Sequence, residues 1–328
     1  MNYRKFGNTD LNVSEVGFGA WGIGGPAMAG EVPIGWGSVD DSVSAAALKK
    51  SFELGINFYD TADFYGLGHS EELIGSTFGG RKDVIIATKV GHRISPENKI
   101  MLDYSAEYII QACESSLRRL RRDTIDYYQL HSARMEHLRQ GECVEAMERL
   151  KKEGKIRYWG LSLNTFSPEP ESEFLIGNKL ADGFQLVLNI MNQRALGVVR
   201  KSAEAGYGVI ARMPLQFGLL TGKFSRDTTF EKNDHRNFRL TPDILCSSLD
   251  VLEEDVWPLA EKYNIGKTSL SMSYILSYAQ VSTVIPGIKT PAQAEANTMN
   301  IISLDKEDMK KLESVYDKKF SSIVSDMK

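Results

Sequence analysis

Four side chains that can hold or transfer a proton stand at or just after the ends of consecutive apolar segments. They are Asp60, Tyr65, Lys89 and His131. A lysine that ends an apolar segment is costly to bury without a partner, so Lys89 needs a nearby anion. Asp60, at the end of the preceding apolar segment, is the natural candidate. We therefore expect the four side chains to share one site.

These residue types suit the addition of hydride to a carbonyl carbon, which requires a proton for the developing alkoxide. A free tyrosine has a pKa of about 10, which is high for a donor at neutral pH. A nearby cation lowers a phenol pKa, so we expect Lys89, held by Asp60, to lower that of Tyr65. His131 is expected to donate to the carbonyl oxygen and to orient it.

Each of these residues also has an ordinary structural explanation. A tyrosine after a strand is usually a packing residue, a lysine at a strand end is usually a solvated charge, and a single histidine is more often structural than catalytic. The combination favours a site, because the segments that carry the residues are consecutive strands of one predicted sheet.

Short apolar runs alternate with stretches of helical periodicity, which is the pattern of a parallel sheet with helical connections. The predicted strands are 16–19, 56–60, 83–89, 125–131, 156–160, 183–188, 208–213 and 281–285. The predicted helices include 42–54, 70–78, 105–122, 142–153, 249–263, 269–279 and 305–316. Eight such units predict an α/β protein with a (β/α)8 TIM barrel, in which active sites lie at the carboxyl ends of the strands.

Two further features complete the predicted fold. Residues 1–15 precede the first strand and are expected to form a hairpin across the barrel floor. Extra helices are expected near the C-terminus. No linker divides the chain, so residues 1–328 are predicted to form a single domain.

Several segments resemble the aldo-keto reductases of the general bacterial type. They are the stretch from Phe58-Tyr-Asp-Thr-Ala-Asp-Phe-Tyr-Gly to Ser70-Glu-Glu-Leu-Ile-Gly, the strand Ile85-Ile-Ala-Thr-Lys, the stretch Asp126-Tyr-Tyr-Gln-Leu-His, and Gly154-Lys-Ile-Arg-Tyr-Trp-Gly-Leu-Ser. The resemblance covers essentially the whole chain in colinear order. It implies a (β/α)8 barrel, and it implies that the family's catalytic tetrad falls on Asp60, Tyr65, Lys89 and His131.

A glycine pattern near the N-terminus matches a dinucleotide-binding fingerprint. Gly17, Gly19 and Gly22 follow an apolar run, as in a Rossmann fold. The fingerprint requires a helix directly after it, whereas the sequence that follows is too rich in glycine and proline for a regular helix. We therefore interpret this stretch as an active-site loop.

Two late segments are better candidates for binding a cofactor. The loop 214–223 contributes Pro214, Leu215, Gly218 and Lys223. The segment that follows the last strand contributes Gly287, Lys289, Gln293 and Asn297. Backbone amides and a helix N-terminus favour phosphates. The resemblance implies that these segments hold the pyrophosphate, the 2′-phosphate and the adenine, so Lys289 favours NADPH/NADP+ over NADH. On charge alone, a solvated lysine at a helix start would be the favoured explanation of Lys289.

The resemblance also implies a nicotinamide end. Ser162 and Gln185 match carboxamide contacts, whereas Asn164 is displaced by one position. Arg212 stands where the family has an aromatic residue beneath the ring, and a guanidinium there adds charge. Trp21 and Phe64 are candidates for the substrate pocket.

The composition excludes several classes of protein. The 328 residues include 39 basic and 43 acidic side chains, a net charge of −4, which argues against non-specific nucleic-acid binding. No signal-peptide pattern, membrane span or metal-ligand spacing is found, so no metal and no membrane contact are expected. Three scattered cysteines fit a reducing compartment, and we expect a cytoplasmic protein. The expected partner is a small carbonyl compound, and a homo-oligomer stays open.

Two other functions remain as alternatives. One is a cofactor-binding regulatory or partner subunit with weak reductase activity, as in the channel-associated members of the family. The other is a barrel glycosidase with Asp60 and Asp63 as its carboxylate pair. The second leaves Tyr65, Lys89, His131 and the phosphate-binding segments unexplained.

Overall fold

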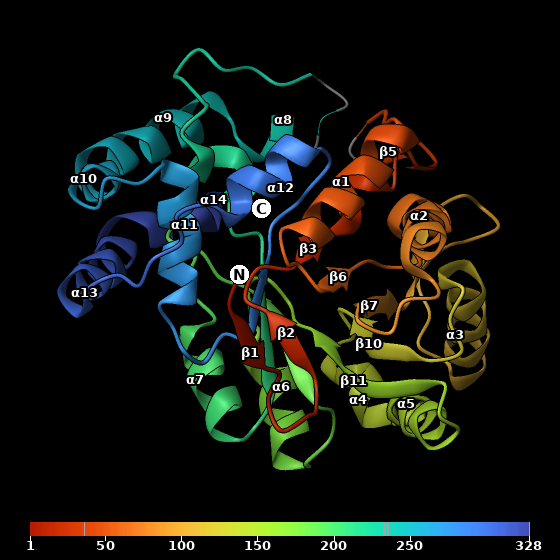
Figure 1. The fold of residues 1–328 in the computed structure, drawn as a ribbon. Helices are drawn as coiled ribbons and strands as arrows, with labels where there is room; N and C mark the ends of the chain where they lie inside the picture. The colour runs from red at the N-terminus through yellow and green to blue at the C-terminus, as the bar shows by residue number, and fades with distance from the viewer. Residues whose placement is uncertain (36, 232–233, 235, 328) are drawn as a thin grey trace.

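Eight parallel strands form the centre of the molecule, and helices surround them (Figure 1). The computed structural model describes residues 1–328 except 36, 232–233, 235 and 328. The strands are β3 (Phe18–Gly19), β6 (Phe58–Asp60), β7 (Ile85–Val90), β10 (Ile125–His131), β11 (Ile156–Ser162), β12 (Gly183–Val187), β13 (Gly208–Arg212) and β14 (Thr283–Ile285). Each pairs with the next in this order.

The sheet closes on itself between its first and last strands. Parallel bridges join Val16 to Val284 and Gly19 to Gly287, and the amide of Gly19 donates to the carbonyl of Pro286 at 2.9 Å. A side chain at position 19 would collide with that backbone, because a Cβ there would lie 2.8 Å from the Pro286 oxygen. The predicted TIM barrel is confirmed.

Helices follow the strands and cover the outer face of the barrel. They are α1 (Asp41–Glu53), α2 (His69–Phe78), α3 (Ala106–Leu120), α4 (Met135–Gln140), α5 (Glu142–Lys152), α6 (Glu169–Gly177), α7 (Leu196–Glu204), α11 (Lys267–Leu276) and α12 (Pro291–Thr298). Polar residues begin several of them: the side chain of Asp40 accepts from the amides of Ser42 and Val43 at the start of α1. Because helices cover the sheet, strands such as β7 are buried at every position.

The N-terminal hairpin closes the floor of the barrel, as predicted. Its strands β1 (Tyr3–Lys5) and β2 (Asn12–Ser14) pair antiparallel. Phe6, which follows β1, is fully buried and packs edge-on against Tyr127 with ring centroids 4.9 Å apart. Glycine is needed at positions 183 and 208, because a Cβ at either would lie within 2.7 Å of the Phe6 ring.

The described residues of the loop between β3 and α1 contain no α-helix, in agreement with the rejection of a Rossmann fold. It forms a 3-10 turn, η1 (Ala20–Ile23), and a small hairpin of β4 (Met28–Ala29) and β5 (Val32–Pro33). The glycines of the fingerprint therefore serve close backbone approach in a loop.

The C-terminal helices differ in their limits from the prediction. The helix expected at 249–263 begins earlier, as α9 (Pro242–Val251), because the side chain of Thr241 caps it by accepting from the amide of Ile244. A π turn, η4 (Leu252–Val256), then leads into α10 (Trp257–Lys262). Pro258, near the start of α10, has no N–H to continue the hydrogen bonds of a regular α-helix, which accounts for the irregular turn before it.

The end of the chain is longer in helix than predicted. After α8 (Arg236–Arg239) and the helices above, α13 (Lys306–Val315) continues through η5 (Tyr316–Phe320) into α14 (Ser321–Asp326). The sequence has an uncharged stretch from Thr268 to Ile288, and most of it lies in α11 and β14. Within the described residues, no helix is both long and apolar enough to cross a membrane.

Candidate active site

The carboxyl ends of β6, β7 and β10 lie side by side at one mouth of the barrel. Lys89, which is fully buried on β7, donates from Nζ to Asp60 Oδ2 at 2.5 Å and to the carbonyl of Thr61 at 2.8 Å. The same Nζ lies 3.3 Å from the hydroxyl of Tyr65 and 4.9 Å from the centre of its ring. The structure thus brings together the three side chains whose partnership the sequence predicted.

Two buried amides hold the other oxygen of the Asp60 carboxylate. Oδ1 accepts from Nε2 of Gln129 at 3.0 Å and from Nε2 of Gln185 at 2.7 Å. The two amides are also joined to each other, at 3.2 Å. Both oxygens of Asp60 are therefore occupied, so the carboxylate is fixed and faces Lys89.

Gln129 was not among the residues predicted from the sequence. It lies two positions before His131, so the alternation of strand side chains places both on the inner face of the barrel. That spacing was the available signal. Gln185, which was expected to contact a nicotinamide carboxamide, donates from its Nε2 to Asp60.

Lys89 retains its charge in this setting. Burial lowers the pKa of an amine, but the neighbouring Asp60 and Tyr65 act in the opposite direction, and the pKa of Lys89 is raised overall. Lys89 is thus a permanent cation beside the Tyr65 hydroxyl.

The pKa of Tyr65 is raised rather than lowered, contrary to the expectation from the sequence. Burial is the largest cause, Lys89 opposes it, and Asp60 adds to the rise. The expectation was wrong because it counted the cation alone. A paired carboxylate offsets much of the field of Lys89, and removal of the phenol from water penalises the phenolate. Tyr65 therefore holds its proton at neutral pH.

His131 faces Tyr65 edge-on across the mouth, with ring centroids 6.0 Å apart. Its pKa is well below the usual value, first because of burial and then because of His92, Lys89 and Arg212. A neutral imidazole has one N–H to donate. Nδ1 of His131 is buried and has no hydrogen-bond partner among the described residues.

A second histidine, which the sequence analysis missed, contacts His131. His92 begins β8 (His92–Ile94), which pairs with β9 (Ile100–Leu102) in a hairpin beyond β7. The two imidazole rings meet edge-on with centroids 4.3 Å apart. In the sequence, His92 stands three residues after Lys89, which is only weak evidence for a place in the site. The hairpin of β8 and β9 is what brings His92 into contact with His131.

We expect His92 to make the protein sensitive to acid. Burial lowers the pKa of His92 to about 4, so between its unfolded pKa and pH 4 the unfolded chain binds a proton that the folded chain does not. Stability therefore falls as the pH drops, by about 1–2 kcal/mol from pH 7 to pH 5 for this residue. Urea unfolding at both pH values should show a smaller loss in His92→Phe than in the wild type. An unchanged loss would contradict the assignment.

The predicted carboxamide residues lie beside the tetrad. Ser162 at the end of β11 is in register with His131 on one side and with Gln185 on the other. Asn164, which is displaced by one position from the family pattern, caps the following turn by accepting from the amides of Phe166 and Ser167.

Arg212 ends β13 and lies close enough to Tyr65 and Asp60 to interact electrostatically with both. Its Nη2 donates to the carbonyl of Leu163 at 3.2 Å and to Thr165 Oγ1 at 3.0 Å. Its Nε has no partner among the described residues. Burial lowers the pKa of Arg212, while Tyr65 and Asp60 oppose that change.

The first of the two cofactor segments follows β13 directly. Pro214 and Leu215 lead into η3 (Gln216–Thr221), where Gly218 has a φ of +100° that favours glycine. A Cβ there would lie 2.9 Å from the ring of Phe224. Lys223 follows on the surface.

The second cofactor segment joins β14 to α12. Gly287 is exposed and open, the side chain of Thr290 caps α12 by accepting from the amide of Gln293, and Asn297 is buried. The amide of Lys289 donates to Gln293 Oε1 at 2.7 Å. The stem of Lys289 packs against Gly22 in the loop after β3, where a Cβ at position 22 would lie 2.7 Å from its Cγ.

The predicted pocket residues also lie at the mouth. The ring of Trp21 stacks on that of Tyr65 with centroids 6.1 Å apart, and its Nε1 donates to the carbonyl of Ile34. Phe64 lies 5.4 Å from His92 between ring centroids. The aromatic rings at the mouth therefore include His92 as well as Trp21 and Phe64.

The donor set fits a nicotinamide dinucleotide. Lysines occur in both predicted phosphate segments, a capped helix begins at the second of them, and buried atoms of His131 and Arg212 have no partner among the described residues. In the part of the chain that the structure describes, no group of three or more His, Cys, Asp or Glu side chains could hold a metal ion.

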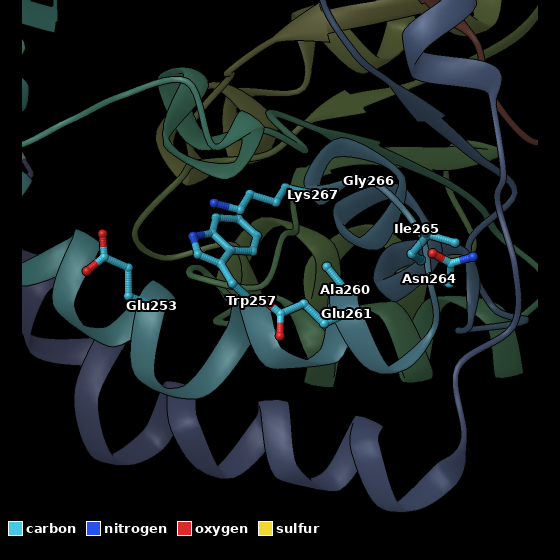
Figure 2. Close-up of a pocket in the computed structure, with 8 residues that line it drawn as sticks. All are labelled: Glu253, Trp257, Ala260, Glu261, Asn264, Ile265, Gly266 and Lys267. Carbon is cyan, nitrogen blue, oxygen red and sulfur yellow. The ribbon is translucent and has the colours of Figure 1, made fainter.

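A hollow of about 660 Å³ lies elsewhere, between η4, α10 and α11 (Figure 2). Lys267 lies over the ring of Trp257 there, 4.9 Å from its centre. None of the predicted site residues lines this hollow, so it is distinct from the barrel mouth.

Known proteins resemble this chain over almost its whole length. The model of the Aldo/keto reductase family matches residues 15–317. An uncharacterized oxidoreductase, YqkF of Bacillus subtilis, is 31% identical over 318 residues, which is 96% of each chain. The L-galactose dehydrogenase of Arabidopsis thaliana is 28% identical and covers 96% of this chain and 94% of its own.

A solved structure shares the fold at similar identity. It is the glycerol dehydrogenase AKR11B4 from Gluconobacter oxydans, with a TM-score of 0.80, 28% identity, and coverage of 97% of this chain and 96% of its own. From the family match and the barrel fold, we conclude that the chain belongs to the aldo/keto reductase family, whose members are oxidoreductases that use nicotinamide cofactors.

Proposed function

We propose that the protein catalyses the NADPH-dependent reduction of an aldehyde or ketone, and the reverse oxidation of an alcohol, with Tyr65 as general acid. The observation that carries the proposal is the position of Lys89 Nζ, which bonds to Asp60 at 2.5 Å and lies 3.3 Å from the Tyr65 hydroxyl. The bound nicotinamide cofactor supplies the hydride.

The side chains divide the remaining work. Tyr65 holds its proton until negative charge develops on the carbonyl oxygen, and then donates it. Lys89 favours that transfer, because its charge is next to the phenolate that is left behind. Gln129 and Gln185 fix Asp60, and Asp60 fixes Lys89. His131, as a neutral ring, donates a hydrogen bond that orients the carbonyl oxygen.

Lys289 supports NADPH as the preferred cofactor. It stands just before the capped N-terminus of α12, where a phosphate gains from free amides and from the helix dipole. The relatives include both preferences by name: an aldo-keto reductase of Schizosaccharomyces pombe is named for NADP(+), and a methylglyoxal reductase of Escherichia coli is called NADH-specific.

We expect Lys289→Gln to raise the KM for NADPH by about tenfold to a hundredfold, because a charge-assisted hydrogen bond to phosphate is lost. The KM for NADH should change little. The control is Lys152→Gln, since Lys152 is exposed in the last turn of α5, which carries none of the predicted cofactor residues. Equal changes with both cofactors would contradict the assignment.

The activity itself is tested by cofactor oxidation over a panel of carbonyl compounds: an aromatic aldehyde, methylglyoxal and a sugar aldehyde. We expect turnover with NADPH well above that with NADH. Binding of NADPH without reduction of any carbonyl would overturn the enzymatic proposal and favour a regulatory role. A relative does carry the name of a potassium channel subunit, but no feature of this site favours that alternative.

The glycosidase alternative is not favoured either. Both oxygens of Asp60 are engaged by Lys89 and by two amides, so Asp60 is not available as one of two free carboxylates. A small carbonyl compound as substrate, a cytoplasmic location, and the absence of nucleic-acid and membrane partners remain predictions. So does the possible homo-oligomer.

A further inference from the structure

Arg212 makes the reacting end of the site more positive than the tetrad alone. The charged groups that act on the Tyr65 hydroxyl are Lys89, Asp60 and Arg212. Lys89 and Asp60 form a close pair and offset one another. Arg212 adds a second cation to this centre.

No carboxylate among the described residues is hydrogen-bonded to Arg212, and the nearby carboxylate of Asp60 is already paired with Lys89. In the part of the chain that the structure describes, its hydrogen bonds go to the carbonyl of Leu163, to the hydroxyl of Thr165 and to the sulfur of Met213, all of which are neutral. His131, which also lies beside Tyr65, adds no charge, because its low pKa keeps it neutral. Among the three charged groups named above, Lys89 and Asp60 cancel, so the charge of Arg212 is left uncompensated.

That charge acts differently on the two forms of a nicotinamide. The reduced ring is neutral and the oxidised ring is a cation, whereas the phosphates are the same in both forms. The carbon that accepts hydride is bonded to the oxygen that Tyr65 protonates, so the ring must lie close to Tyr65. It therefore lies within the field of Arg212.

We propose that Arg212 makes this site bind the reduced cofactor more tightly than the oxidised cofactor, and so favours turnover in the direction of carbonyl reduction. The inference rests on the proposed function. Two unit charges several Å apart at an effective dielectric constant of about 20 interact strongly enough to change the ratio of the two affinities by about tenfold or more. Weak binding of the oxidised form speeds its release after each turnover.

The test measures the Kd of NADPH from its own fluorescence and the Kd of NADP+ by competition, without substrate. We expect the wild type to bind NADPH at least about tenfold more tightly. Arg212→Gln should reduce the ratio of the NADP+ Kd to the NADPH Kd by about tenfold, chiefly because NADP+ binds more tightly. Arg212→Lys keeps the charge and should retain most of the ratio.

Lys223→Gln is the matched control. Lys223 lies in the predicted pyrophosphate segment, whose ligand is identical in both forms, so its loss should weaken NADPH and NADP+ alike and leave the ratio unchanged. A wild-type ratio near one would overturn the inference without any variant, even if Arg212→Gln does not fold. So would a ratio that falls equally in the Gln and Lys variants, or in neither. If the wild type binds neither form, the proposed function fails as well.

Discussion

Tyr65→Phe is expected to lower kcat/KM for carbonyl reduction by about a thousandfold or more, because loss of a positioned general acid typically costs about 10²–10⁴ in rate and no other group of the tetrad can replace it. His131 is held neutral by burial, and Lys89 is engaged by Asp60 and the carbonyl of Thr61. The Kd of NADPH should stay within about twofold, because the variant removes one oxygen and leaves the ring.

Steady-state kinetics together with NADPH fluorescence measure both parts of this expectation. Tyr207→Phe is a matched control. It removes a hydroxyl that donates to the carbonyl of Leu175 outside the barrel mouth, and it should leave kcat/KM nearly unchanged. Retention of more than a tenth of the activity in Tyr65→Phe would remove Tyr65 from the role of acid.

Lys89→Met is expected to destabilise the protein by about 3–5 kcal/mol and to abolish turnover, because it leaves the buried carboxylate of Asp60 without the cation that is bonded to it. Two amides still donate to that carboxylate, but neither carries a charge. The double variant Asp60→Asn/Lys89→Met removes both charges, so we expect it to recover most of the stability and none of the activity.

Urea unfolding of the three proteins separates stability from catalysis. Lys50→Met is the comparison at the surface. Lys50 pairs with Glu295 at 2.9 Å but is about one-third exposed, and loss of such a pair costs about 1 kcal/mol or less. If Lys89→Met and Lys50→Met were equally stable, the pair of Lys89 and Asp60 would not be the buried element described above.

The order of the strands and the positions of their ends followed from the sequence. A run such as Ile85-Ile86-Ala87-Thr88 is apolar on both faces, which only a covered parallel strand satisfies, so its limits could be predicted within about two residues. The limits of α9 were missed because its start depends on the Thr241 cap rather than on periodicity.

The sequence also allowed the main residues of the site to be predicted. Parallel strands end at one edge of the barrel, so the neighbouring positions of Asp60, Lys89 and His131 follow from the strand order alone. The stretch from Phe58 to Gly75 and the strand that leads to Lys89 identify the family without any structure.

Only the tertiary structure decided the electrostatics. The direction of the Tyr65 pKa depends on how far burial outweighs Lys89, and that balance is a sum over all surrounding atoms rather than a property of spacing. His92 reaches the site through a hairpin, and Gln129 joins it through a contact with Asp60 that spans 69 positions of the chain. Arg212 was recognisable as a change from the family pattern, but that its hydrogen-bond partners are all neutral is a fact of packing. Residue spacing along strands determines which side chains share an edge, whereas charge, burial and hydrogen bonding depend on what surrounds each of them.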